Sequence, residues 1–596
     1  MNGQTLELDN IVQKDRLACE IANLYTSYET FRGTWLAEKA EIQKYVFATD
    51  TTKTTNSQLP WKNKTTLPKL CQIRDNLYAN YMAALFPKRK WLTWESDNQD
   101  DQKKKKARAI EAYMANVLDQ PDFKKEISKL VYDFIDYGNV YASIKWVDKS
   151  QTLAGAIKYG YVGPMPQRIS PVDIVFNIAS PSFSNTPKIV RSLMTLGDFA
   201  TEVEKESSGD QDDEYKKILD YTVSLRESVS AWTGGITVKD AVFSVSGFGS
   251  FTDYLRSGFV EVLTLIGDIY DVENKTLHKN KIITVADRHK LISIKDIPSS
   301  MSGSNLWHCG WRIRQDTLIA MGPLDNLVGM QYRIDHLENL KADVFDLIAA
   351  PPLKIKGLVD DFTWGPFARI HVGDDGDVEV MAPDVNALNA NMEIANLENK
   401  MEEMAGSPKE AMGFRTPGEK TMYEVQRLEN AAARIFATKI KQFEEEILEP
   451  MLNGMLEMAR RKLDATTIRI FDEELNAVDF LEISKDDLIG SGRIRPMAAR
   501  NFAERAELVQ NLNAFFASSI GADPEMKAHF STLKMAYMFE DILDIESYDV
   551  VLPYVRLTEQ AEAQKLANVG AEDTQMEAMT PSGLSPEDTD EELPEA

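Results

Sequence analysis

An apolar stripe that runs for about 25 residues and stops at two consecutive prolines constrains this chain more than any other feature. It covers residues 325–349, and Pro351-Pro352 end it because proline disfavours helical backbone in the residue before it. The apolar positions recur at helical spacing: Leu327, Met330, Ile334, Leu337, Leu340, Val344 and Leu347. The pattern predicts a helix that Asp325 caps, roughly 37 Å long at 1.5 Å per residue.

A short β-like insertion and a second helix follow the prolines. Residues 350–383 resemble a strand pair with a turn at Gly373-Asp374-Asp375-Gly376, and residues 384–405 return to helical spacing. Two long helices therefore bracket a small hairpin-like insertion.

Beyond residue 405 the chain alternates between loop and helix. Two prolines and three glycines within 406–418 predict a loop. Residues 419–463 predict a long helix, and Pro450 is the position where that helix should kink. Strands are expected again over 464–496, and helices over 497–556.

The first 322 residues mix helices with strands. Helices are expected over 9–47 and 107–118, and a third is opened by the Trp61–Lys69 stretch and closed at Phe86-Pro87. Alternating β-branched stretches predict strands at 140–147, 172–178, 258–271 and 281–286. The combination predicts the α+β class.

The net charge of the chain limits how it can bind nucleic acid. It has 596 residues with a formal net charge of −26, and its 43% hydrophobic content is that of a folded protein. Affinity for DNA comes largely from Lys and Arg, so any DNA contact should be local. Residues 557–596 hold eleven acidic residues against Lys565 alone, which favours a solvated acidic tail.

Cysteine usage and the N-terminus favour a protein made without export. Cys19, Cys71 and Cys309 lie far apart and form no CxxC pair, as expected in a reducing cytosol. The start, Met1-Asn2-Gly3-Gln4, lacks the features of a secretory signal, and no run of about 18 apolar residues predicts a membrane span.

Catalytic signatures are missing, so we expect no enzyme activity, no cofactor and no metal. The six histidines form no zinc-binding spacing, and no GxSxG motif occurs. The nearest approach to a phosphate-binding loop, Gly413 through Gly418 to Lys420-Thr421, is interrupted by Glu419, whose carboxylate would repel a phosphate.

The basic residues in and beside the predicted loop over 406–418 can also be interpreted as DNA contacts. Lys409, Arg415 and Lys420 lie within twelve residues of one another, and a few cations on a loop can touch DNA phosphates without reading sequence. An ordinary surface loop with ordinary charges explains the same spacing equally well.

The order of these elements resembles that of the portal, or head-to-tail connector, proteins of short-tailed bacteriophages. Four stretches carry the likeness: Trp61-Lys62-Asn63 through Phe86-Pro87; Ile169-Ser170-Pro171-Val172-Asp173-Ile174; the pair Gly267 to Asp271 and Ile283 to Asp287; and Lys420-Thr421-Met422-Tyr423-Glu424-Val425 leading to Leu448-Glu449-Pro450. Family members commonly have a small residue after that threonine, whereas Met422 and Tyr423 are bulky.

The resemblance implies a ring of about twelve subunits around an axial channel for double-stranded DNA. It assigns the parts of the chain by position: wing 1–322, first stem helix 323–349, clip 350–383, second stem helix 384–405, tunnel loop 406–418, kinked tunnel helix 419–463, β return to the wing 464–496, helical crown 497–556 and acidic tail 557–596.

The same resemblance implies partners and contact residues. Lys409, Arg415 and Lys420 would face non-specifically bound DNA, and the clip would contact the terminase large subunit and later the tail adaptor protein. The clip residues singled out for this role are Lys354, Lys356, Asp360, Trp364 and Arg369. Major capsid and scaffolding proteins would be further partners, at one capsid vertex of a virion assembled in the host cytoplasm.

Two other functions remain as alternatives. One is a packaging-associated DNA motor or nuclease, which requires a nucleotide or metal site. The other is a non-portal tail or scaffold subunit that oligomerises through its long helices.

Overall fold

The computed structural model describes most of the chain between residues 16 and 496. The described ranges are 16–86, 92–96, 101–148, 151–153, 157–159, 161–206, 219–220, 223, 259–272, 274–286, 288, 290–297, 305–357, 370–372, 376–381, 389–405, 436, 438–463, 466–472, 477–483, 488 and 492–496. They belong to one compact unit, residues 1–501.

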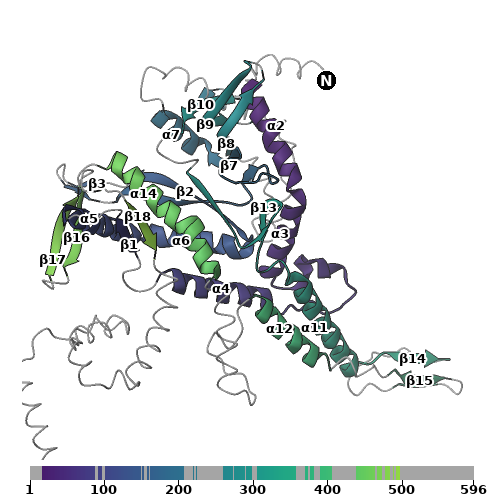
Figure 1. Cartoon of the computed structure of the whole chain (residues 1–596). Coiled ribbons are helices and arrows are strands. Elements are labelled where there is room, and N and C mark those ends of the chain that lie inside the picture. The colour runs from purple at the N-terminus through teal and green to yellow at the C-terminus, as the bar shows by residue number, and fades with distance from the viewer. Residues whose placement is uncertain are drawn as a thin grey trace, which may run out of the picture. The chain divides into compact units, whose positions relative to one another are not determined.

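The architecture is a mixed α+β fold with several small antiparallel sheets (Figure 1). The helices are α2 (Arg16–Phe31), α3 (Gly33–Val46), α4 (Lys69–Leu85), α5 (Asp101–Leu118), α6 (Pro121–Asp136), α7 (Leu196–Glu206), α11 (Val328–Ala349), α12 (Ala390–Ala405) and α14 (Glu449–Lys462), with short 3₁₀ turns Thr51–Lys53 and Thr55–Gln58 and a π-helical turn Glu444–Leu448. The strands are β1 (Leu92–Ser96), β2 (Asn139–Asp148), β3 (Gln151–Leu153), β4 (Ile157–Tyr159), β5 (Val162–Ile169), β6 (Ile174–Phe176), β7 (Lys188–Thr195), β8 (Phe259–Asp271), β9 (Thr276–Ala286), β10 (Lys290–Asp296), β11 (Leu306–Gly310), β12 (Arg312–Arg314), β13 (Thr317–Met321), β14 (Leu353–Lys356), β15 (Asp377–Val380), β16 (Thr466–Asp472), β17 (Ala477–Ile483) and β18 (Gly492–Pro496).

The largest sheet has five antiparallel strands in the order β10-β9-β8-β7-β6, and α2 covers one face of it. Ile21 and Tyr25 of α2 are fully buried against Leu263 and Val285 of the sheet. Arg32, between α2 and α3, is also buried. Its guanidinium donates to the carbonyls of Pro171, Val172 and Ile174 at 2.5–2.7 Å, and so fixes the chain that leads into β6.

The main core lies around α4, α5, α6, α14 and the three-stranded sheet β11-β2-β5. Phe134 of α6 meets Tyr81 of α4 edge to face and packs against Phe443. Residues far apart in sequence close this core, because β1 pairs with β18 in antiparallel register from Leu92 opposite Pro496 to Ser96 opposite Gly492.

Several sequence expectations are confirmed. Two helices fill residues 16–46, a strand covers 139–148, and strands occur within or across the other three stretches expected to form them. The hairpin-like insertion is confirmed as a β pair, β14 with β15. Pro450 stands in the first turn of α14 directly after the π-helical turn, and the kink at this position stays a prediction.

One expectation about a helix start is wrong. Asp325 does not cap α11, which begins at Val328 after Leu327; its carboxylate instead accepts from the Gly322 N–H at 2.9 Å and pairs with the buried Lys39. The helix expected to open in the Trp61–Lys69 stretch is confirmed as α4, which begins at Lys69 after Pro68 and ends at Leu85.

At Gly138 the backbone packs closely against the backbone of Gly322. Gly138 has φ +67° at the turn between α6 and β2, a region that favours glycine. A Cβ built on it would lie 2.3 Å from the backbone nitrogen of Gly322, just before α11. The turn therefore has no room for a side chain.

We predict that Gly138→Ala lowers the free energy of unfolding by about 2–4 kcal/mol, because the backbone must shift and adopt an unfavourable φ. Urea unfolding of the purified variant checks this. The matched control is Gly329→Ala, where a Cβ meets nothing within 4 Å and stability should stay unchanged or rise slightly. Equal stability of Gly138→Ala and wild type would contradict the close approach.

Candidate functional site

Helices α11 and α12 run side by side, with β14 and β15 beyond the end of α11 (Figure 1). We call α11 with α12 the helix pair, and β14 with β15 the outer strands. The base of the helix pair contacts α3 and α4. In the outer strands Leu353 lies opposite Val380 and Lys356 opposite Asp377.

A row of polar side chains on α11 holds the extended segment before α4 together with the first two residues of that helix. We call this stretch, Lys62–Leu70, the anchor segment. The row consists of residues spaced four apart, which therefore follow one side of the helix: Gln331, Asp335, Asn339 and Asp343.

Each member of the row binds backbone groups of the anchor segment. Asp343 accepts from the N–H groups of Lys62 and Asn63 at 3.1 and 2.9 Å. The Asn339 amide accepts from the Thr65 N–H at 2.8 Å and donates to the Thr65 carbonyl at 2.7 Å.

Nearer the base, the row continues in the same way. Asp335 accepts from the Leu67 N–H at 3.2 Å and from the Thr66 hydroxyl at 3.0 Å. Gln331 donates to the Leu67 carbonyl at 2.6 Å and accepts from the Leu70 N–H at 3.2 Å. The row thus satisfies backbone groups that have no sheet or helix partner of their own.

The match between helix and segment has a geometric basis. Four helical residues advance about 6 Å, and two extended residues advance about 6.6 Å, so alternate residues of an extended chain keep step with every fourth residue of a helix. Asn63, Thr65 and Leu67 are such alternate residues, and they meet successive members of the row.

The second helix is tied to the same segment by an ion pair. Lys69 Nζ lies 2.5 Å from Glu402 Oε1 of α12, and both side chains are about 95% buried. Removing one partner of such a pair leaves an isolated buried charge and is strongly destabilising. One stretch of nine residues therefore fixes both members of the helix pair.

Asp335 is the titratable member of the row that lies deepest. Its side chain is fully buried, and its Oδ2 has no hydrogen-bond partner. Burial raises the pKa of Asp335 to about 6, although hydrogen bonds from Leu67, Thr66 and Gln331 oppose the shift.

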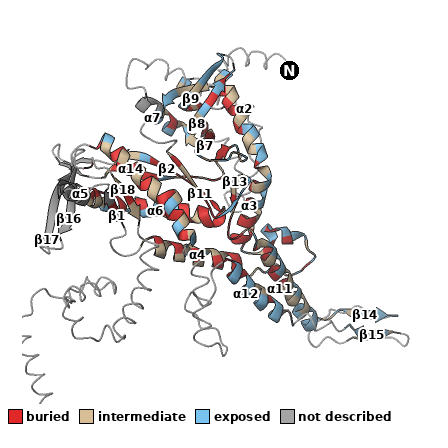
Figure 2. Ribbon diagram, in the orientation of Figure 1, coloured by how far each residue is buried: buried red, intermediate tan, exposed pale blue. Residues whose placement is uncertain are grey.

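The outer half of the helix pair is chemically different from its base. Only Gln331, Ile334, Asp335 and Asn339 of α11 are buried, all in its first twelve residues (Figure 2). Large apolar side chains are exposed further out: Leu340, Phe345, Leu347 and Ile348 on α11, Met392 on α12, and Ile355, Val372, Val380 and Met381 at the outer strands. Exposed large apolar side chains gathered at one end of a protein are typical of an interaction surface.

The sequence-predicted contact residues fall partly within this surface. Lys354 and Lys356 are exposed on β14, and Lys354 pairs with Glu379 of β15 at 3.0 Å. Asp360, Trp364 and Arg369 lie outside the described residues, as do Lys409, Arg415 and Lys420. Sequence reasoning missed the polar row, although its spacing of four is visible in the sequence.

Across the described ranges, no three His, Cys, Asp or Glu side chains are grouped so that they could hold a metal ion. No helix in that part of the chain is long and apolar enough to cross a bilayer. No protein-family model matches this sequence, and no curated protein sequence matches it.

We predict that Asp335→Asn changes how stability depends on pH. Because the folded-state pKa of Asp335 is raised to about 6 from an ordinary value near 4, the folded state holds the proton more tightly. The protonated Asp335 carboxyl therefore stabilises the folded state at low pH, and this stabilisation is lost as pH rises from about 4 to about 6. Relative to Asp335→Asn, wild type should lose roughly 3 kcal/mol over that interval.

Urea unfolding curves collected across this pH interval make the comparison. Asn339→Ala is the control, since it removes the three hydrogen bonds of the Asn339 side chain but no titrating group. Its curve should lie below wild type by about 1–3 kcal/mol at every pH. Parallel curves for wild type and Asp335→Asn would contradict the assignment.

Proposed function

We propose that this chain is the subunit of a phage portal ring, a channel through which double-stranded DNA enters and leaves the capsid. The observation that carries the proposal is the exposed apolar outer half of the helix pair. On this reading, the helix pair is the stem and the outer strands belong to the clip.

The outer half of α11 has no buried residue of its own. A two-stranded β unit is marginally stable at best in water, and here it stands on helix ends with no buried residue after Asn339 on α11. Neighbouring copies that pack their stems together would cover Leu340, Leu347 and Ile348. The exposed side chains are thus explained by an assembly of many copies.

The charge of the chain supports a conduit rather than a DNA-binding protein. At −26 per copy, a ring would repel DNA over most of its surface, and a duplex that must move over long distances should not adhere. Sparse cations such as Lys409, Arg415 and Lys420 would supply the few local contacts. The proposed partners are the terminase large subunit, the tail adaptor and the capsid and scaffolding proteins.

Electron microscopy of the purified full-length protein tests the ring. We expect closed rings of about twelve copies with a central hole. Monomers, open filaments or unclosed stacks would contradict the proposal and favour the non-portal scaffold alternative. Retained ATP hydrolysis in the purified protein would instead favour the motor.

A stem variant tests the surface that carries the proposal. Leu340→Glu combined with Leu347→Glu should abolish rings and leave a folded monomer, because each change places a charge where copies must pack. Mass photometry measures the assembly, and circular dichroism confirms folding. Lys125→Glu, an exposed lysine on α6, makes the same change in net charge and should leave the rings intact; rings that survive the stem variant would refute the stem assignment.

A loop variant tests the DNA contact separately. Lys409→Ala, Arg415→Ala and Lys420→Ala together should leave ring assembly intact while reducing genome packaging or retention, since only the phosphate contacts are lost. The measurement is the fraction of DNA-filled heads made by a phage carrying the variant. A normal yield of filled heads would exclude a DNA-holding role for these residues.

A further inference from the structure

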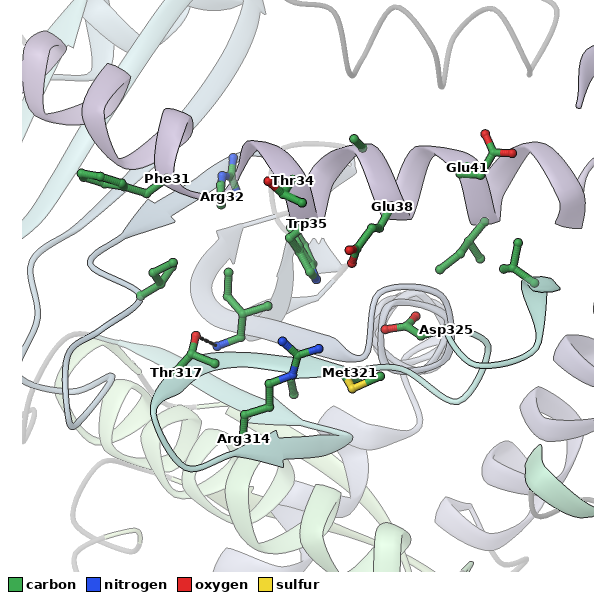
Figure 3. A pocket seen from close by; sticks show the side chains of 16 residues that line it. Phe31, Arg32, Thr34, Trp35, Glu38, Glu41, Arg314, Thr317, Met321 and Asp325 are labelled. Carbon is green, nitrogen blue, oxygen red and sulfur yellow. Dashed lines mark hydrogen bonds between the residues drawn. The ribbon is translucent and has the colours of Figure 1, made fainter. Parts of the chain in front are cut away.

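A cavity of about 700 Å³ opens between α3, the β12–β13 pair and the start of α11 (Figure 3). Its walls are largely apolar and half-buried, and include Ile178, Ile319, Met321 and Val328. Phe31 stands at its edge with 71% of its surface exposed. A cavity of this size holds a small ligand or several side chains of a protein partner.

Three polar groups of this cavity can bind a partner. The Trp35 Nε1–H is buried without a hydrogen bond. Glu38 of α3 and Arg314 of β12 are exposed to solvent and form no ion pair in the described part of the chain. Figure 3 shows Trp35 and Glu38 extending from α3 toward Arg314 on the opposite wall.

The chemistry of these groups is that of a surface that binds a protein partner. An unpaired buried N–H costs about 1–3 kcal/mol, which a partner's oxygen would recover. An exposed aromatic, a tryptophan and an arginine around an apolar floor are the residues that dominate binding energy at protein interfaces. The exposed carboxylate of Glu38 can pair with a cation, and the exposed guanidinium of Arg314 can stack on an aromatic face or donate to a carbonyl.

The tip of the β8–β9 hairpin carries the complementary chemistry. Tyr270 and Leu277 lie opposite each other across the hairpin, and each is 52% exposed. Val272 at the turn is 64% exposed. Lys275 and Lys279 are also exposed, so the tip combines an aromatic, aliphatic side chains and cations.

The conformation of this tip is fixed in advance. Asp271 is buried and accepts from the backbone N–H of Asn274 at 3.0 Å and from its side-chain amide at 2.8 Å. Lys275 holds the left-handed φ of +49° that the turn requires. A preorganised tip loses little entropy when it binds.

We propose that the β8–β9 tip of one copy occupies the α3/β13 cavity of a second copy. The Lys275 and Lys279 ammonium groups pair with Glu38, the Tyr270 ring lies against Arg314, and an oxygen of the tip accepts from the Trp35 Nε1–H. A ring needs two different complementary surfaces on each subunit, and the tip and the cavity form such a pair. This inference rests on the proposed ring and adds a second contact to that of the stem.

A charge-reversal cycle in the full-length protein tests the contact. Glu38→Lys alone, and Lys275→Glu with Lys279→Glu, should each raise the protein concentration needed for half-assembly by at least about tenfold. The combination should return it to within about threefold of wild type, because the ion pairs are re-formed in reverse. Mass photometry over a dilution series gives the values, and Lys125→Glu, at a residue that lines neither the cavity nor the tip, is the control for a charge reversal elsewhere on the chain.

A cross-link gives a second measurement that does not depend on weakened assembly. Val272→Cys with Phe31→Cys, in a chain whose Cys19 and Cys71 are changed to Ser, should form disulfides between copies on oxidation. Either cysteine alone should not. Unchanged or additive effects in the charge cycle, or no cross-link within assembled rings, would overturn the tip contact while leaving the portal proposal intact; a wild-type protein that forms no rings would overturn the portal proposal itself.

Discussion

The rest of the structure depends on the polar row of α11. Three of the four buried residues of α11 are Gln, Asp and Asn, so hydrogen bonds to the anchor segment set its position together with the packing of Ile334 in the main core. The buried Lys69–Glu402 ion pair ties α12 to the same anchor segment. Because these bonds are directional, they fix the angle and register of the helix pair relative to α4 more strictly than apolar contacts would.

This arrangement divides the helix pair into two halves with different requirements. The base is complete within one chain, through the anchor segment, the Lys39–Asp325 pair and the close approach of Gly138 to Gly322. The outer half has exposed apolar side chains and ends in two strands that pair only with each other among the described residues. In the proposed ring, such a chain would hold its helix pair in place before neighbouring copies pack against the outer half.

The local elements could be predicted from the sequence, whereas their long-range contacts could not. Helical spacing before Pro351 located α11, and the β-like stretch between residues 350 and 383 located the β14–β15 pair. The start of α11 was mispredicted because Asp325 has a buried partner, Lys39, that lies 286 residues away. The spacing of Gln331, Asp335, Asn339 and Asp343 was visible, but nothing in a single sequence identifies the extended segment that they bind. The β1–β18 pairing and the cavity that joins Trp35 to Arg314 depend on the same kind of distant contact.

Amide hydrogen exchange, compared between assembled and dissociated protein, tests the central claim most directly. The account predicts that residues 331–339 of α11 are protected in both states, because their own chain holds them. Residues 344–356 and 377–381 should become protected only on assembly, when neighbouring copies cover the apolar outer half. Equal protection of the outer half in both states would contradict the claim that this surface is completed by other copies of the chain.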